Sequence, residues 1–214
     1  MIRIKICGNT SVVDALDAAR AGAHAIGLIL YEHSPRCIDP EEAARICAAM
    51  PPFVTTVGVF VNESIDTIRI LQREIGFDLV QLHGDEPPEM VEEFGPRTIK
   101  ALRLHHEDDL AKLDAYASAG ALLLDTPKEG VYGGSGEVGD WHLAKLAVDR
   151  LLEKGQPIIL AGGLNPENVA TAIRRVTPFG VDVASGVEAQ PGAKDRTAMR
   201  RFVVEAAAAG IGLR

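Results

Sequence analysis

The stretch PIILAGGLNP, residues 157–166, predicts a buried strand, a glycine turn and the start of a helix in immediate succession. Pro157–Ala161 is a short apolar run with the length of a core strand. Gly162 and Gly163 turn the chain, and Asn165 followed by Pro166 is typical of a helix cap and first turn. A strand–turn–helix unit of this kind is the building block of α/β folds.

The same unit recurs from one end of the chain to the other. Apolar runs predict strands at Ile2–Ile6, Ala25–Leu30, Thr55–Val61, Leu79–Leu82, Thr98–Leu102, Ala121–Leu124, Pro157–Ala161 and Val181–Ala184. Segments with helical periodicity lie between them, at about Val12–Ala21, Glu41–Met50, Ile65–Ile75, Pro88–Glu93, Asp108–Ser118, Trp141–Glu153, Pro166–Val176 and Arg196–Ala208. We expect Ser64 and Asp195 to cap helices, and Gly22, Gly76 and Gly180 to end helices in the left-handed conformation.

Eight uninterrupted units match a closed (β/α)8 barrel. An open doubly wound sheet usually has five or six strands and a glycine-rich turn after the first strand. Here the first turn is Cys7-Gly8-Asn9, and the glycine-rich turns follow the seventh and eighth strands instead. No low-complexity linker divides the chain. We therefore predict an α/β fold in which residues 1–214 form a single TIM-barrel domain with eight parallel strands.

Composition limits the classes of partner. The formal net charge of −8 argues against nucleic acid, because a phosphate backbone demands a basic surface. No stretch approaches the roughly 20 apolar residues of a membrane span, and the first residues lack the pattern of a signal peptide. Three well-separated cysteines suggest neither disulfides nor a metal site, so we expect a reducing cytoplasm. We expect no cofactor.

The chemistry of such a barrel lies at the carboxyl ends of its strands. Cys7 ends the first strand, where it is either a small buried residue or a reactive thiol. Asp125 follows four apolar residues and is either an exposed loop residue or a partly desolvated general acid. Arg36 follows Pro35 and is either a surface residue or a carboxylate ligand. His83 is interpreted as a hydrogen-bonded structural residue.

The glycine turns predict a phosphate site. Gly162 and Gly163 follow the seventh strand, and Ser185 and Gly186 follow the eighth. Glycine lets a phosphate approach backbone N–H groups closely, and neighbouring late turns of a barrel are a common place for such a site. The alternative is that these are tight turns only.

Taken together, these segments resemble the phosphoribosylanthranilate isomerase family of tryptophan biosynthesis. The resemblance covers nearly the whole chain in order, through residues 5–8, 34–36, 58–62, 80–86, 123–126, 133–136, 140–141, 160–169, 182–188, 191–192 and 194–195. It implies a TIM barrel and an isomerase that converts N-(5-phosphoribosyl)anthranilate to 1-(2-carboxyphenylamino)-1-deoxyribulose 5-phosphate by an Amadori rearrangement. It implies a monomer or a homodimer that binds a phosphorylated small molecule.

The resemblance also implies roles for individual residues. Asp125 would be the general acid, Cys7 the general base and Arg36 the ligand of the anthranilate carboxylate, with phosphate bound by the Gly162-Gly163 and Ser185-Gly186 turns. A free thiol has a pKa of about 8.5 and is only slightly ionised at neutral pH, so Cys7 requires a cation nearby. Lys5 points to the same side of the strand, but the sequence does not place its ammonium group.

Four residues depart from the family pattern, and two alternative functions are open. Leu28, Leu30, Cys37 and Gly139 stand where the family usually has larger or aromatic residues, which affects the expected substrate fit. One rival is the histidine-pathway aminoimidazole carboxamide ribotide isomerase, which has an aspartate in place of Cys7. Another is a catalytically silent barrel that binds a sugar phosphate. Cys7 itself disfavours the first rival, which would also be expected to have a second glycine-rich phosphate turn midway along the chain. Retention of both Cys7 and Asp125 disfavours the second.

Overall fold

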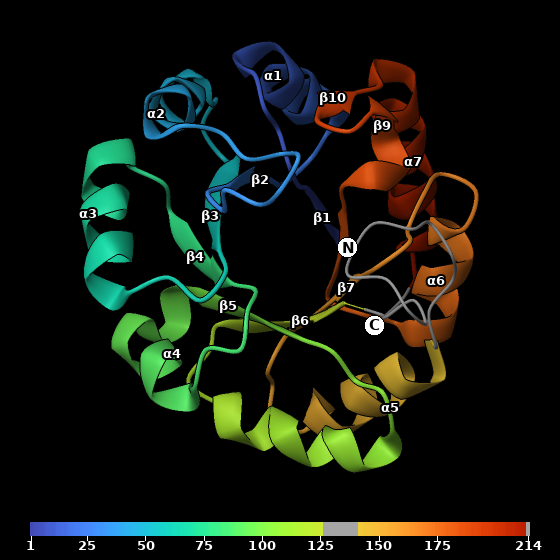
Figure 1. The fold of residues 1–214 in the computed structure, drawn as a ribbon. Helices are drawn as coiled ribbons and strands as arrows, with labels where there is room; N and C mark the ends of the chain where they lie inside the picture. The colour runs from blue at the N-terminus through green and yellow to red at the C-terminus, as the bar shows by residue number, and fades with distance from the viewer. Residues whose placement is uncertain (126–140, 213–214) are drawn as a thin grey trace.

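Eight parallel strands close into a barrel in the computed structural model, which describes residues 1–125 and 141–212 (Figure 1). Each strand pairs with the next along the chain, and β1 pairs with β8 to complete the ring. The predicted fold is therefore confirmed. The strands are β1 (Arg3–Ile6), β2 (Ala25–Ile29), β3 (Thr55–Phe60), β4 (Leu79–Leu82), β5 (Thr98–Leu102), β6 (Ala121–Asp125), β7 (Ile158–Ala161) and β8 (Gly180–Val183).

Helices surround the barrel (Figure 1). The α-helices are α1 (Val12–Ala21), α2 (Pro40–Ala49), α3 (Ile65–Ile75), α4 (Pro88–Phe94), α5 (Trp141–Leu152), α6 (Val169–Val176) and α7 (Arg196–Ala209). The 3₁₀ helices are η1 (Gly95–Arg97), η2 (Glu107–Tyr116) and η3 (Ser185–Val187), and a hairpin of β9 (Glu188–Gln190) and β10 (Ala193–Lys194) precedes α7. In the described ranges, no helix has the length and apolar character that crossing a membrane requires.

Most of the predicted helix signals are confirmed. The Ser64 and Asp195 side chains accept hydrogen bonds from the first turns of α3 and α7, and Gly22 and Gly76 end α1 and α3 with φ of 106° and 82°. The prediction for Gly180 is wrong, because this residue opens β8. The left-handed residue after α6 is instead Thr177, with φ of 53°, and the proline that follows it disfavours a further helical residue.

Three other segments differ from the sequence prediction. The helix expected at 166–176 begins only at Val169, with Asn168 rather than Asn165 at its N-cap position. The segment expected to be a helix at 108–118 is the 3₁₀ helix η2, and the β9–β10 hairpin was not predicted. Strands β9 and β10 are only three and two residues long, which is too short for hydrophobic alternation to reveal.

The strands alternate between two apolar layers, as a pleated sheet requires. Ile4, Ile6 and Leu28 belong to the large buried cluster that includes residues of the surrounding helices. A second, smaller cluster fills the barrel interior, with Val57, Ile99, Ala101, Ala121, Leu123, Ile159 and Ala161. Polar side chains of β1 and β8 interrupt this interior, and these lie below the candidate site.

A buried ion pair holds the loop between β4 and α4. Lys100 and Glu86 have side chains that are each 1% exposed, and their Nζ and Oε2 atoms are 2.6 Å apart. Lys100 also donates to the carbonyl of Gly84, and Glu86 accepts hydrogen bonds from the backbone N–H groups of Asn62 and Gly84. The carboxylate of Glu86 thus fixes two neighbouring loops at the mouth of the barrel.

Replacement of Lys100 by methionine (Lys100→Met) should destabilise the fold by about 3–5 kcal/mol, because it leaves the buried Glu86 without a counter-charge. Denaturant unfolding measures this loss. The matched control is Lys154→Met, which removes a lysine–aspartate contact of the same 2.6 Å length, from Lys154 to Asp114, at the exposed surface. That control should change stability little, because solvent screens the pair. Similar losses in the two variants would contradict the role of burial.

Candidate active site

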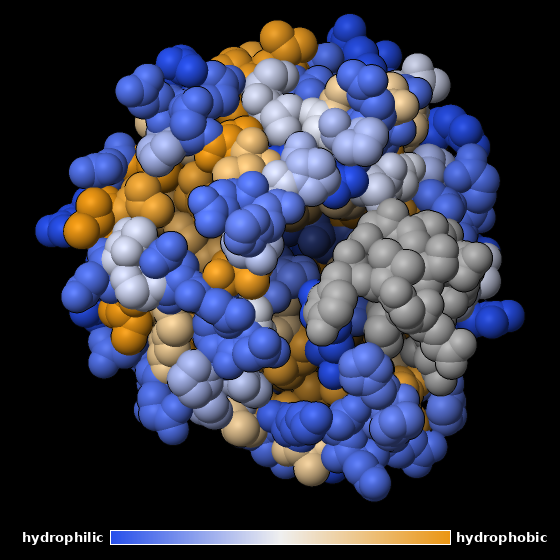
Figure 2. All heavy atoms as spheres, in the orientation of Figure 1, coloured by the Kyte–Doolittle hydropathy of each residue, from blue (hydrophilic) through white to orange (hydrophobic). Residues whose placement is uncertain are grey.

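A cavity of about 720 Å³ opens at the carboxyl ends of the barrel strands. Figure 2 shows this face of the molecule, hollowed near its centre with hydrophilic residues beside the hollow. The cavity is lined by six of the seven residues that the sequence nominated, namely Cys7, Arg36, Asp125, Gly162, Gly163 and Ser185. The seventh, Gly186, does not line it. Residues from opposite ends of the chain therefore meet in one space.

Cys7 continues directly from β1 and is 5% exposed. Its N–H donates to the carbonyl of Val183, 2.8 Å away. A Cβ atom on Gly27 would lie only 2.5 Å from the Cys7 sulfur, so the glycine provides the space that the thiol occupies. Burial raises the pKa of the Cys7 thiol, and Lys5, whose charge acts in the opposite direction, does not fully offset it.

Lys5 lies inside the barrel, which settles the position that the sequence left open. Its side chain is 4% exposed, and its Nζ lies 2.9 Å from Oδ1 of Asp182 on β8. Burial lowers the pKa of Lys5, but Asp182 and Cys7 more than offset this effect and the net pKa is raised. Lys5 is therefore a buried, protonated amine.

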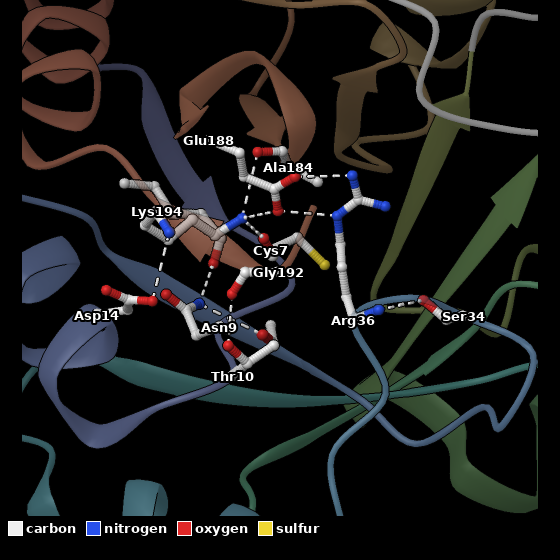
Figure 3. A network of polar contacts seen from close by, with 12 residues as sticks. Cys7, Asn9, Thr10, Asp14, Ser34, Arg36, Ala184, Glu188, Gly192 and Lys194 are labelled. Carbon is white, nitrogen blue, oxygen red and sulfur yellow. Dashed lines mark hydrogen bonds and ion pairs between the residues drawn. The ribbon is translucent and has the colours of Figure 1, made fainter. Parts of the chain in front are cut away.

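Arg36 is held by a carboxylate that sequence reasoning did not single out. Its Nε and Nη2 atoms donate to the two oxygens of Glu188, at 2.8 and 2.7 Å. Lys194 Nζ lies 2.8 Å from Glu188 Oε1 and also donates to the carbonyl of Cys7, 2.6 Å away. Figure 3 shows Glu188 between the two cations, with Cys7 beside them. The hairpin is thereby tied to both Arg36 and Cys7.

The pKa values of Glu188 and Lys194 are both lowered, for different reasons. Burial raises the pKa of Glu188, but hydrogen bonds from Arg36 and Lys194 outweigh it, and the net pKa is lowered. The pKa of Lys194 is lowered by burial, which its contact with Glu188 only partly offsets. Glu188 and Lys194 both fall within the motif segments of the sequence, but their roles depend on a hairpin that was not predicted. Only three-dimensional proximity reveals them.

Asp125 ends β6 beside two basic side chains. His83 Nε2 lies 3.4 Å and Arg103 Nε 3.9 Å from Asp125 Oδ2. The Nδ1 atom of His83 is 2.8 Å from Nε2 of Gln81, so the ring is held from both sides. His83, interpreted from the sequence as a hydrogen-bonded structural residue, makes hydrogen bonds with both ring nitrogens and also lines the cavity. A histidine ring in this position can orient the Asp125 carboxyl group.

Glycine is required in the two turns for different structural reasons. Gly162 and Gly163 have φ of 85° and 63°, which side chains rarely tolerate. A Cβ atom on Gly186 would lie 1.9 Å from the carbonyl oxygen of Leu164, so this glycine allows the loops after β7 and β8 to touch. The turns bring the backbone of the half-buried residues Gly162, Gly163 and Ser185 to the cavity. Such backbone can donate to an anion.

Leu28, Leu30 and Cys37 are not among the side chains that line the cavity, and Leu28 is completely buried in the outer core. These three departures from the family pattern therefore lie outside the described cavity wall. Gly139, the motif at 133–136, Thr126 and Asp140 lie outside the described residues. Within residues 1–125 and 141–212, no cluster of histidine, cysteine, aspartate or glutamate side chains could hold a metal ion.

Comparison with known proteins agrees with this geometry. Residues 4–205 match the family model for N-(5'phosphoribosyl)anthranilate (PRA) isomerase. The N-(5'-phosphoribosyl)anthranilate isomerase of Acidithiobacillus ferrooxidans is 49% identical over 204 residues, which cover 95% of this chain and 96% of that protein.

Two solved structures share the fold across almost the full length. A phosphoribosyl anthranilate isomerase in complex with reduced 1-(o-carboxyphenylamino)-1-deoxyribulose 5-phosphate has a TM-score of 0.85 and 40% identity, covering 97% of this chain and all of that one. A monomeric form generated from the dimeric enzyme of Thermotoga maritima has a TM-score of 0.85 and 38% identity, with the same coverage. The chain therefore belongs to the N-(5'-phosphoribosyl)anthranilate isomerase family.

Proposed function

We propose that this enzyme converts N-(5-phosphoribosyl)anthranilate to 1-(2-carboxyphenylamino)-1-deoxyribulose 5-phosphate, with Asp125 as general acid and Cys7 as general base. The observation that carries the proposal is that a thiol and a carboxyl group from distant strands line one cavity with backbone turns suited to phosphate. In the ring of strands, β7 and β8 separate β6 from β1, so the two groups approach a substrate from different sides.

The first step opens the furanose ring. The Asp125 carboxyl group donates its proton to the ring oxygen, and the bond between that oxygen and C1 breaks. The lone pair of the anthranilate nitrogen forms a double bond to C1, which gives a Schiff base. His83, at 3.4 Å, orients the carboxyl group for this transfer.

The second step moves the double bond. The Cys7 thiolate removes the proton from C2, and the electron pair of that C–H bond forms the C1–C2 double bond of an enolamine. The C1–N double bond opens at the same time, and its electron pair returns to the anthranilate nitrogen. Tautomerisation then moves the hydroxyl proton to C1 and leaves a ketone at C2. One proton has left Asp125 and one has reached Cys7, so exchange with solvent restores the starting state without a cofactor.

Two anionic groups of the substrate need fixed partners. Arg36 binds the anthranilate carboxylate with the N–H groups that Glu188 does not occupy, since the two carboxylate oxygens of Glu188 contact only Nε and Nη2. The backbone of Gly162, Gly163 and Ser185, which line the cavity, binds the phosphate. The three cysteines are unpaired, which fits an enzyme of the reducing cytoplasm.

The amino-terminal face of the barrel supports a homodimer. Phe53 is fully exposed at φ of 72°, beside a mainly apolar cavity of about 350 Å³ that Phe179, Val57 and Ile159 help to line. A two-fold axis would place the Phe53 ring of each copy in the cavity of the other, which makes the contact self-complementary. The family relative from Thermotoga maritima is described as dimeric.

Turnover of N-(5-phosphoribosyl)anthranilate, followed by chromatography of the product, tests the reaction. Cys7→Ser and Asp125→Asn should each lower kcat/KM by at least about a hundredfold, the scale of a missing acid or base. Cys47→Ser is the matched control, because Cys47 does not line the cavity. Full activity in either site variant, or equal turnover of the histidine-pathway ribotide, would contradict the proposal.

Arg36→Met should raise KM by about tenfold or more, because the substrate carboxylate loses a charge-assisted hydrogen bond. The fold should survive, because Lys194 still neutralises Glu188. Arg45→Met removes an exposed arginine paired with Glu42 and should leave steady-state kinetics unchanged. An unchanged KM for Arg36→Met would remove this residue from the substrate site.

Phe53→Asp should convert the dimer to a monomer in analytical ultracentrifugation, because a carboxylate cannot enter an apolar cavity without a partner. Isomerase activity should persist, since Phe53 lies at the face opposite the catalytic cavity. Val204→Asp provides an exposed apolar control outside the amino-terminal cavity. A monomeric parent protein, or a dimeric Phe53 variant, would contradict the proposed interface.

A further inference from the structure

A buried lysine and a buried aspartate lie directly below the reactive thiol. Lys5 and Cys7 are two residues apart at the end of β1, so their side chains point to the same side of the sheet. Ile4 and Ile6, in alternate positions, belong to the outer core, which places Lys5 and Cys7 toward the barrel interior. The register Lys5↔Asp182 between β1 and β8 brings the carboxylate alongside the lysine.

The proposed mechanism assigns no task to this pair. Its Nζ–Oδ1 distance is 2.9 Å, and the side chains of Lys5 and Asp182 are 4% and 8% exposed. An ion pair this deeply buried contributes little net stability compared with apolar packing, because both groups lose their hydration. Its position, one layer below Cys7 inside the barrel, suggests a function in the site.

We infer that Lys5, held in place by Asp182, is the cation that stabilises the thiolate of Cys7; the inference rests on the proposed function, in which that thiolate is the base. A thiolate next to a fixed ammonium group is favoured electrostatically, and the low-dielectric interior strengthens the interaction. Lys5 is a positioning residue, because it acts through the thiol.

The other charges around Cys7 do not replace Lys5. Burial is the largest influence on the thiol and raises its pKa; Lys5 is the largest influence that lowers it, followed by Lys194. Lys194 and Arg36 are engaged by Glu188, which cancels much of their charge. The remaining titratable or charged residues that line the cavity with Cys7 are Tyr31, His33, His83, Asp85, Arg103, Asp125 and Asp182.

Asp182 has two opposite effects on the pKa of the Cys7 thiol. Its carboxylate keeps Lys5 protonated and positioned, but its own negative charge raises the pKa of Cys7. An amide at position 182 can still accept a hydrogen bond from Lys5 but carries no charge. Asp182→Asn should therefore lower the pKa of the Cys7 thiol, whereas Lys5→Met should raise it. A purely structural role would instead make both substitutions harmful in the same way.

The test measures the pH dependence of alkylation of Cys7 by iodoacetamide in the ligand-free protein. A Cys37→Ser/Cys47→Ser background leaves Cys7 as the sole cysteine of the chain. Addition of Lys5→Met should shift the alkylation midpoint upward by about one pH unit or more and slow labelling at pH 8 by about tenfold. Lys5→Arg, which retains the positive charge, should restore much of the rate.

Asp182→Asn should shift the midpoint downward, opposite to Lys5→Met. The double variant Lys5→Met/Asp182→Asn leaves no unpaired buried charge, so it addresses any failure of Lys5→Met to fold, and its midpoint should lie above that of the parent. An unchanged midpoint for Lys5→Met, or an upward shift for Lys5→Arg as large as that for Lys5→Met, would overturn the inference.

Steady-state kinetics separate this inference from the proposed function. Lys5→Met should lower kcat at neutral pH by about tenfold, with partial recovery at higher pH and little change in KM, because substrate contacts remain. If Cys7→Ser is fully active, the proposed function fails, whereas the alkylation midpoints still report on Lys5. If Cys7→Ser is inactive and Lys5→Met has a normal midpoint, only the Lys5 inference fails.

Discussion

The closure of the barrel between β1 and β8 is the constraint on which the site depends. This register sets Lys5 beside Asp182 and carries Cys7 to the mouth of the barrel, where its N–H donates to Val183. A shift by one residue would turn Cys7 and Lys5 outward into the apolar layer under the helices and bring Ile6 inward. Burial of the isoleucines on one side and ion pairing on the other therefore fix the same register.

Two buried glutamates organise the loops above the barrel. Glu188 joins Arg36 to Lys194, and through Lys194 it reaches the backbone of Cys7. Glu86 accepts backbone hydrogen bonds from two loops and is neutralised by Lys100. In both cases one carboxylate satisfies several donors from separate segments. Separate loops at the mouth are thereby held by buried carboxylates.

The barrel and the residues nominated for chemistry could be predicted, because strand ends are set by local patterns and the site lies at those ends. Cys7 and Asp125 each follow an apolar run. The roles of Glu188 and Lys194 could not be predicted, since their contacts depend on a short hairpin at residues 188–194 that lacks hydrophobic alternation. The location of Lys5 depends on the pairing of β1 with β8, 177 residues apart, and His83 depends on the position of β6.

The charge of the chain makes these local arrangements necessary. A protein with a formal charge of −8 repels a substrate that carries a carboxylate and a phosphate. Such a substrate also brings negative charge toward Cys7 and so opposes ionisation of the thiol. Fixed cations must therefore both bind the substrate and stabilise the thiolate, and different residues supply them. Arg36 lines the cavity, whereas Lys5 and Lys194 lie behind Cys7 and are almost fully buried. A cation behind the thiol can stabilise its anion without binding the substrate in its place.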